Sequence, residues 1–163
     1  MDALLFLNGE TLTGDVVLDG AGLAVDRGLE TAIAVSLFTD RRADPDDVLP
    51  DPNGQRRGWW GDVVPPTVDG TPADGDRIGS RLWLLSREKI IPETIARART
   101  YAREALQWLI DDGVAARIDV DVTVPKTPVG GGVLALAITV YRPDGGAENY
   151  DYAWTGQAQK GSA

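Results

Sequence analysis

The apolar and polar positions along the chain predict short strands near its start and one amphipathic helix further on. Two short apolar runs, Leu4–Leu7 and Val16–Leu18, flank a segment rich in turn-forming residues, so we expect a hairpin or two short strands there. Apolar residues return at helical spacing over residues 92–111. Pro92 suits the first position of this helix, and Gly113 is typical of the residue that follows one.

Residues 114–154 show the pattern of a β-sheet. Residues 116–124 alternate between apolar and polar side chains, and residues 133–141 form a second strand-like run. Gly130–Gly132 favours a turn between them, and a second turn leads into a third run at residues 149–154. We therefore expect a three-stranded antiparallel meander behind the helix.

Residues 29–39 fit two patterns equally well. Ile33, Val35 and Leu37 alternate as they would in a strand. Leu29, Ile33 and Leu37 also lie at helical spacing. Periodicity alone leaves both structures open for this segment.

Residues 40–80 predict a long loop. Asp, Arg, Pro and Gly dominate this stretch, and its apolar content is thin. Long loops in compact domains are often functional, and thin apolar content favours a segment that becomes ordered on assembly. Together the patterns predict an α+β fold with a single compact domain over residues 1–154, including this loop, and a flexible tail over residues 155–163.

Composition removes several classes of chemistry. The chain has 163 residues, enough for one domain with a real core, and it contains neither Cys nor His. Disulfides, thiolate nucleophiles, imidazole metal ligands and Ser-His-Asp triads are therefore excluded. The net charge of −9 disfavours a nucleic-acid partner, and no apolar run approaches the ~20 residues that span a bilayer, so we expect no membrane partner.

Two acidic groups and one glycine run are weak candidates for chemistry. The loop cluster lacks the ligand order of a calcium-binding loop, so a solvated loop is favoured; its members are Asp40, Asp44, Asp46, Asp47 and Asp51. Asp119 and Asp121 share a strand face, as the exposed residues of any half-buried strand do. Gly130–Gly132 lacks the Lys and helix start of a phosphate-binding loop. We expect no catalytic residue, no metal site and no cofactor.

The segment Arg56-Arg57-Gly58-Trp59-Trp60-Gly61-Asp62 is less ordinary. Two adjacent indoles in a polar loop need a surface to cover them, which leaves open the chain's own core, a protein interface or a stacked ligand. Positive charge also gathers at Arg41-Arg42, Arg81 and Arg87 in an otherwise acidic protein. Three roles are open for these arginines: they are solvated at the surface, they form ion pairs with the Asp-rich loop, or they recognise an acidic protein partner.

The order and spacing of several strings resemble the gene-product-46 family of Mu-like phages and prophages, whose members belong to the tail baseplate. The strings are LETA and SLFTDRRA within residues 29–43, RGWWGD at residues 57–62, GSRLWLL at residues 79–85 and YAREALQWL at residues 101–109. The resemblance covers about residues 15–154. It implies a helix for residues 29–39 and a compact α/β domain that helps build the baseplate wedge.

The resemblance extends in part to the small wedge proteins of T-even phages and other contractile injection systems. There a helix leads into a Leu-x-Thr stretch followed by Gly-Glu-Arg. Here Leu37–Arg42 occupies the corresponding place without the Gly-Glu. The resemblance implies contact with a larger wedge protein and a position near the tail tube and sheath.

These observations favour a structural, non-enzymatic component of a contractile phage-tail baseplate, made in the host cytoplasm and located in the virion tail, with other baseplate and tail proteins as partners. The expected interface residues are Arg41, Arg42, Arg57, Trp59, Trp60, Asp62, Arg81 and Arg87. One alternative is a carboxylate-dependent muralytic, lysozyme-like enzyme using Glu88, Glu93 or Glu104. A second is a carbohydrate- or peptide-binding module built on the Trp pair.

Overall fold

The computed structural model describes residues 28–59, 77–125 and 133–155 in full, together with the strands near the N-terminus and one hairpin in the long loop. The N-terminal strands, in chain order, are β1 (Asp2–Ala3), β2 (Leu5–Asn8), β3 (Thr13–Val16), β4 (Leu18–Asp19), β5 (Gly22–Leu23) and β6 (Val25–Asp26). The predicted turn at Gly130–Gly132 and the tail beyond residue 155 lie outside the described residues.

The N-terminal strands form short antiparallel pairs. β2 pairs with β3, with Leu5 opposite Val16, which confirms the predicted hairpin. β4 pairs with β5, and β1 pairs with β6. Such short strands follow from apolar runs of only a few residues, each interrupted by turn formers.

The C-terminal sheet contains β9 (Arg117–Thr123), β10 (Val133–Tyr141) and β11 (Ala147–Thr155). Its order is β11-β10-β9, with antiparallel neighbours, which confirms the predicted meander. Ile138 of β10 lies opposite Val120 of β9 and Tyr150 of β11. The third strand is longer than the predicted residues 149–154 because it begins at Ala147 and includes Thr155.

The predicted helix at residues 92–111 is divided into α2 (Pro92–Leu106) and α3 (Trp108–Asp111). The Gln107 N–H donates to the carbonyl of Glu104, three residues earlier, at 3.3 Å. This tighter turn interrupts the regular four-residue pattern at Gln107, while the helical residues otherwise match the predicted span. Gly113 follows with a φ of 70°, in the left-handed conformation that ends many helices.

Residues 29–39 form a helix, α1 (Glu30–Phe38), rather than a strand. Ile33 and Leu37, one helical turn apart, are both fully buried, whereas Val35 between them is 39% exposed. A strand would have placed all three side chains on one face. The helical alternative is therefore the correct one, as the family resemblance implied.

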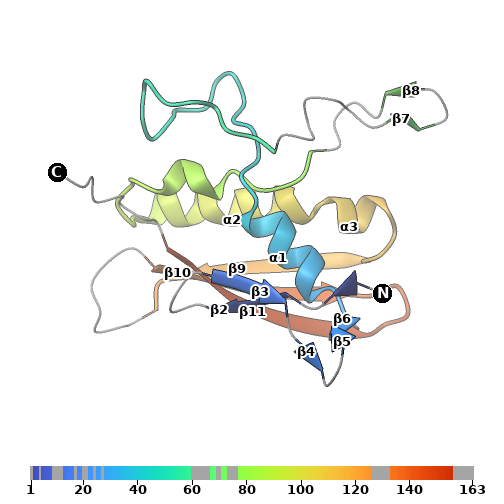
Figure 1. Ribbon diagram of the computed structural model, residues 1–163. Coiled ribbons are helices and arrows are strands. Elements are labelled where there is room, and N and C mark those ends of the chain that lie inside the picture. Colours follow the sequence, from blue (N-terminus) through green and yellow to red (C-terminus); the bar gives the residue numbers. More distant parts are fainter. Residues whose placement is uncertain are drawn as a thin grey trace.

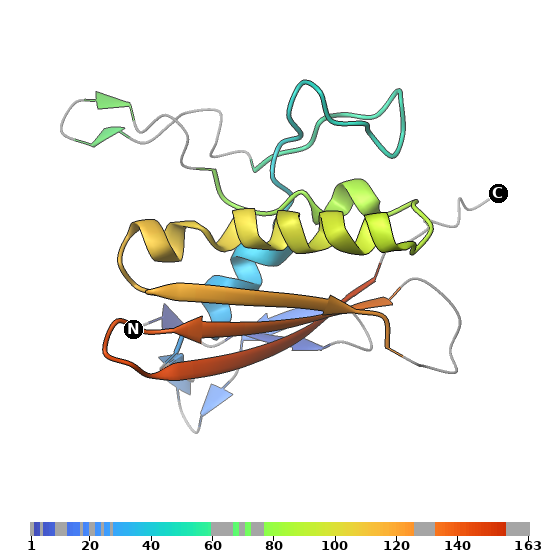
Figure 2. The ribbon, with the colours of Figure 1, turned by 180° about the vertical axis from the view of Figure 1, so that it is seen from behind.

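Helices and sheet pack as layers around one core. Figure 1 and Figure 2 show α2 along one face of the C-terminal sheet and α1 crossing near α2. The short 3-10 helix η2 (Leu82–Leu85) adds four buried side chains. The largest fully buried apolar side chains are Ile33, Leu37, Leu82, Leu85, Leu106, Leu109, Leu134, Leu136, Ile138 and Val140. The α+β prediction is confirmed.

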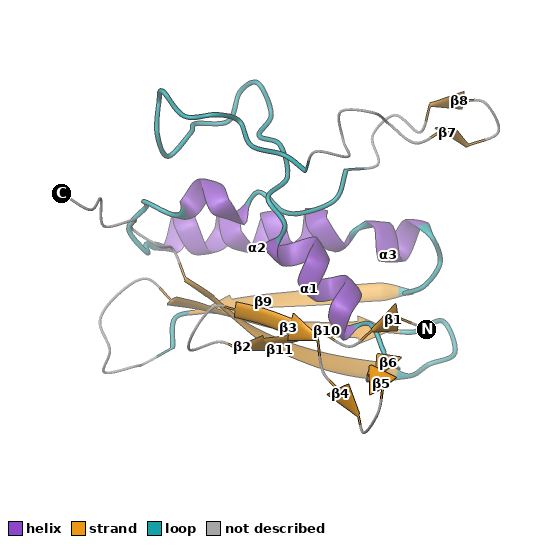
Figure 3. Ribbon diagram, in the orientation of Figure 1, coloured by secondary structure: helices purple, strands orange, loops and turns teal. Residues whose placement is uncertain are grey.

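The long loop leaves this body at the end of α1. Figure 3 shows residues 40–59 on the side of α2 that faces away from the sheet. The prediction of a loop without regular elements needs one correction, because the stretch contains the short hairpin of β7 (Thr67–Val68) and β8 (Thr71–Pro72). With only two residue pairs, this hairpin is shorter than typical strands, so no strand-length apolar run marks it in the sequence.

Candidate functional site

Backbone hydrogen bonds attach the loop to the end of α1. The Ser80 N–H donates to Thr39 O at 2.9 Å, and the Arg41 N–H donates to Ser80 O at 3.0 Å. Further along, the Ala43 N–H donates to Arg56 O at 2.9 Å. The entry of the loop, its return and the segment before η2 therefore lie side by side.

Two glycines make these close approaches possible. Gly79 has a φ of 104°, and a Cβ there would overlap the carbonyl oxygen of Thr39. Gly58 has a φ of 115°, and a Cβ there would lie 2.9 Å from Cβ of Arg42. Both positions need a residue without a side chain, for conformation and for space.

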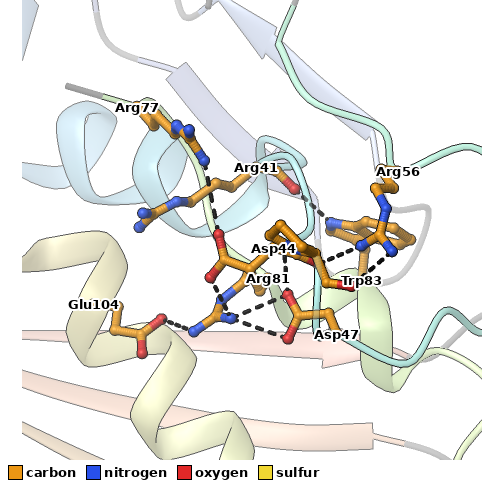
Figure 4. A network of polar contacts seen from close by, with 9 residues as sticks. Arg41, Asp44, Asp47, Arg56, Arg77, Arg81, Trp83 and Glu104 are labelled. Carbon is orange, nitrogen blue, oxygen red and sulfur yellow. Dashed lines mark hydrogen bonds and ion pairs between the residues drawn. The ribbon is translucent and has the colours of Figure 1, made fainter. Parts of the chain in front are cut away.

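Arg81 is the centre of a polar network beneath the loop (Figure 4). Its Nη1 donates to Asp44 Oδ2 at 2.8 Å and to Asp47 at 3.0 Å, and its Nη2 donates to Glu104 Oε2 at 2.6 Å. The guanidinium carbon also lies 4.7 Å from the ring centroid of Tyr101. One cation thus joins two loop carboxylates to α2.

The partners of Arg81 favour its charged form. Burial by itself would lower the pKa of Arg81, but its hydrogen bonds to Glu104 and Asp47, together with their negative charges, raise that pKa above its ordinary value. The side chain of Arg81 is only 14% exposed. Because this cation satisfies carboxylates from two elements at once, its removal would leave like charges close together.

A second group of contacts surrounds Trp83 of η2. Its indole Nε1–H donates to Arg41 O at 2.8 Å, and the guanidinium carbon of Arg57 lies 4.6 Å from the ring centroid. Arg57 also pairs with Asp40 at 2.7 Å. Nearby, Arg56 donates to the carbonyl oxygen of Asp44. Of the arginines for which the sequence left ion pairing with the Asp-rich loop open, Arg81 makes such pairs, with Asp44 and Asp47.

The structure distributes the predicted interface residues over two hollows. Arg41 and Arg81 line a groove of about 1200 Å³ between α1, residues 77–81 and the α2–α3 helices. Arg57 and Arg87 line a smaller hollow of about 500 Å³ beside the end of β11. The two pairs therefore line different hollows.

The remaining predicted residues lie in or beyond the described part of the loop. Arg42 is exposed and packs near Gly58. Trp59 is 38% exposed. Trp60 and Asp62 lie outside the described residues.

Several lining residues were not singled out from the sequence. Arg77, Arg103 and Trp108 line the larger groove, and Trp83 and Trp154 line the smaller hollow. Arg103 carried one local signal, because it lies off the apolar face of its helix. The others depend on the packing of distant segments, for which local sequence offers no signal.

The carboxylates considered for catalysis lie in ion pairs or on the surface. Glu104 pairs with Arg81, Glu88 pairs with Arg97, and Glu93 is exposed at the start of α2. The two aspartates of β9 also have arginine partners: Asp119 pairs with Arg117, and Asp121 pairs with Arg99. Arginine partners and surface positions are typical of solvated carboxylates, whereas a glycosidase needs a pair of carboxylates with one in an apolar pocket.

Two features are absent from the described residues: a metal-binding cluster and a membrane-spanning helix. Within the described ranges, no cluster of three or more Asp, Glu, His or Cys residues is arranged to hold a metal ion. Over the same part of the chain, no helix has the length and apolar character needed to cross a membrane.

Comparison with known proteins confirms the family resemblance. A family model described as "Phage protein GP46" matches residues 29–147. The chain is 44% identical over 151 residues to "Baseplate protein gp46" of Escherichia phage Mu, covering 92% of each chain. It is 42% identical over 146 residues to "Mu-like prophage FluMu protein gp46" of Haemophilus influenzae strain Rd, covering 90% of each. The chain belongs to the phage protein GP46 family.

Proposed function

We propose that the protein is a structural component of a contractile phage or phage-like tail baseplate. The observation that carries this proposal is the 44% identity to the Mu protein named for the baseplate, over 92% of both chains. Identity of this extent means that the whole domain is shared rather than one motif. We extend the proposal to assembly with a larger wedge protein close to the tube and sheath, with residues 1–154 as the assembling unit and residues 155–163 as a flexible tail.

The proposed location follows from the same argument. The chain is made in the host cytoplasm and ends in the tail baseplate of the particle. Its mechanism is assembly: the domain keeps a fixed place and transmits force when the baseplate changes state. A rigid core of packed helices and sheet suits such a role, because close-packed interiors transmit strain with little deformation.

The proposed interface keeps the full set of residues expected from the sequence. Its members are Arg41, Arg42, Arg57, Trp59, Trp60, Asp62, Arg81 and Arg87. The indoles contribute buried area, and the exposed arginines contribute directed hydrogen bonds. Arg81 has a different part, because its 14% exposure and internal ion pairs make it a positioning residue that holds the loop in place.

We propose no catalytic activity and no cofactor. The pairing of Glu104 with Arg81 and of Glu88 with Arg97 supports this view. A muralytic enzyme predicts that one carboxylate-to-amide change abolishes peptidoglycan cleavage while the protein stays folded. A sugar- or peptide-binding module predicts that its ligand quenches tryptophan fluorescence of the isolated protein. The structural role predicts neither result.

The test is the sedimentation of the protein in lysates of induced source cells. We expect it to sediment with tail particles, and we expect the double variant Trp59→Ala, Trp60→Ala to lose that association while staying folded. Circular dichroism of the purified variant provides the control, because an unfolded variant would place the Trp pair in the core. Tails that assemble while the protein stays at the top of the gradient would contradict the baseplate role.

Hydrogen exchange tests the proposed ordering of the loop on assembly. We expect amides in residues 40–80 to exchange more slowly in the assembled particle than in the free protein. Equal protection in both states would mean that the loop is already ordered before assembly.

A further inference from the structure

We propose that the larger groove binds a segment of a partner protein in which carboxylate side chains alternate with apolar ones. This inference rests on the proposed baseplate function and names the chemistry of one partner. The groove lies between α1, residues 77–81 and the α2–α3 helices, and its volume is about 1200 Å³. The residues that carry the argument are Val35, Arg41, Arg77, Ile78, Arg103 and Trp108.

Two hydrogen bonds within the chain fix the backbone of Arg41. Its N–H donates to Ser80 O at 3.0 Å, and its carbonyl accepts from the Trp83 indole at 2.8 Å. Figure 4 shows its side chain extending from this backbone away from Trp83. The fixed backbone therefore places the start of this side chain beside the groove that Arg41 lines.

The same side chain lacks a hydrogen-bond acceptor. Within the described residues, Nε of Arg41 is buried and has no acceptor, and no carboxylate there lies within ion-pair distance of Arg41. Buried donors are nearly always satisfied in folded proteins. Nη1 and Nη2 of the same guanidinium are not among the buried atoms and have no hydrogen bond or ion pair within the described residues, so a carboxylate entering the groove would accept from these terminal nitrogens.

The neighbouring charges favour an anion at this end of the groove. Arg77 has only one distant ion pair, 3.7 Å from Asp44, and Arg103 has none among the described residues. The carboxylates of the groove at this end, Asp44 and Glu104, are both bound to Arg81. Cations without close partners therefore outnumber free carboxylates near Arg41.

The groove also carries acidic residues, which give it a direction. Asp111 accepts a hydrogen bond from Gln107, and Asp112 follows directly after α3. Both lie about two helical turns beyond Arg103. A bound segment would therefore place its carboxylates at the Arg41 end and neutral or basic residues near Asp112.

Apolar side chains beside the arginines distinguish a protein segment from a simple anion. Val35 is 39% exposed and Ile78 is 38% exposed, and half-buried Trp108 lines the same groove. An inorganic phosphate would leave these surfaces in water, and the net charge of −9 repels a nucleic-acid polyanion. A peptide with apolar residues next to carboxylates covers both kinds of surface.

The direct test is an NMR titration of the intact protein with a short peptide in which Glu and Leu alternate. We expect the Nε–H signal of Arg41 and the methyl signals of Val35 and Ile78 to shift together. A matched peptide with Lys in place of Glu should cause no such shift. If the Lys peptide shifts these signals equally, or if inorganic phosphate alone reproduces the shifts, the proposal is wrong.

Charge-changing variants make the titration specific to the groove. We expect Arg41→Gln and Arg103→Glu each to weaken binding of the Glu peptide at least about tenfold, as loss of an arginine at the centre of an interface does. Lys89→Gln removes one positive charge from an exposed residue outside the groove and should leave binding unchanged. Equal binding by all variants would overturn the proposal. Arg103 is exposed, so its variant keeps the test valid if Arg41→Gln fails to fold.

Sedimentation separates this inference from the proposed function. If the normal protein and folded Arg41→Gln both sediment with tails to the same extent, the groove proposal falls and the baseplate function stands. If only the normal protein does so, both are supported. If the normal protein does not associate with tails, the baseplate function falls, and the peptide titration alone decides the groove.

Discussion

The packing of α2 against the C-terminal sheet differs in kind from the attachment of residues 40–59 to the same helix. On the sheet side, the contacts come from apolar residues such as Leu106 and Ile138, which are almost completely buried. On the loop side, the contacts come from Arg81 and its carboxylates. Apolar packing depends on buried area, whereas the ionic network depends on a few directed contacts.

This difference shows how one small domain can combine a rigid body with an adaptable surface. A core side chain contributes through many weak contacts, so losing one weakens the whole fold. A polar network is local, so its loss should loosen the loop and leave the sheet intact. The following predictions test that separation, from the largest expected effect to the smallest.

The core prediction concerns Leu106, which lies on α2 and is 0% exposed. We expect Leu106→Ala to lower the free energy of unfolding by about 3–4 kcal/mol, because it removes buried apolar surface and leaves a cavity. Urea denaturation followed by circular dichroism measures the change. Leu106→Met keeps most of the volume and should cost less than about 1.5 kcal/mol. Equal losses in both variants would contradict a role in close packing.

The second prediction concerns the glycine that brings the loop and α1 together. Gly79→Ala should destabilise the protein by about 2–3 kcal/mol, because the new Cβ would meet the carbonyl of Thr39 at a strained φ of 104°. Gly145→Ala is the matched control, since its φ is 92° and a Cβ there has open space. We expect only about 1 kcal/mol there, the conformational cost alone. Similar values for both would show that space near Thr39 is unimportant.

The third prediction breaks the polar network. Arg81→Met should lower the free energy of unfolding by about 2 kcal/mol, less than the loss of a fully buried ion pair because Asp44 remains 42% exposed. Hydrogen exchange should show faster exchange at the amides of Ala43 and Asp47. The backbone amide of Val120 in β9 should keep its protection against exchange. Uniform loss of protection across all these sites would mean that the two regions are not energetically separate.

The smallest effect is expected at the contact between the sheet and the start of α1. The Leu29 N–H donates to the Tyr150 hydroxyl at 3.1 Å, and that hydroxyl donates to Glu148 at 2.5 Å. Tyr150→Phe should therefore cost about 1 kcal/mol at neutral pH. Denaturation at neutral pH measures it, and a value near that of a core substitution would contradict this estimate.

The same tyrosine predicts an alkaline pH dependence. Burial and the hydrogen bond to Glu148 raise the pKa of Tyr150 to about 12 from 10.0. A pKa that is higher in the folded than in the unfolded protein means that folding favours the protonated tyrosine. The contribution of this group to the free energy of unfolding is therefore complete below about pH 10 and is lost as the pH rises toward about 12. Tyr150→Phe should show a smaller loss of stability over that pH window than the normal protein. An identical slope in both proteins would mean that other groups cause it.

Much of the fold could be predicted from local pattern. Alternation at residues 116–124 and the strand-like run at residues 133–141 led to β9 and β10, and helical spacing after Pro92 led to α2. These patterns have periods of two and about four residues, so they are contained in short stretches of sequence. The concentration of arginine, tryptophan and aspartate in the long loop is also a feature of the sequence itself.

The tertiary structure alone decided the rest. Residues 29–39 became a helix because Ile33 and Leu37 face the same core, which their spacing could not establish. Arg81 reaches Glu104, Asp47 and Asp44 across 23, 34 and 37 positions of the chain. Which charges meet across such separations depends on how the loop closes over the folded helices, and local composition does not determine loop closure. Local periodicity therefore predicted most of the framework, whereas the groove and its network exist only after that framework has packed.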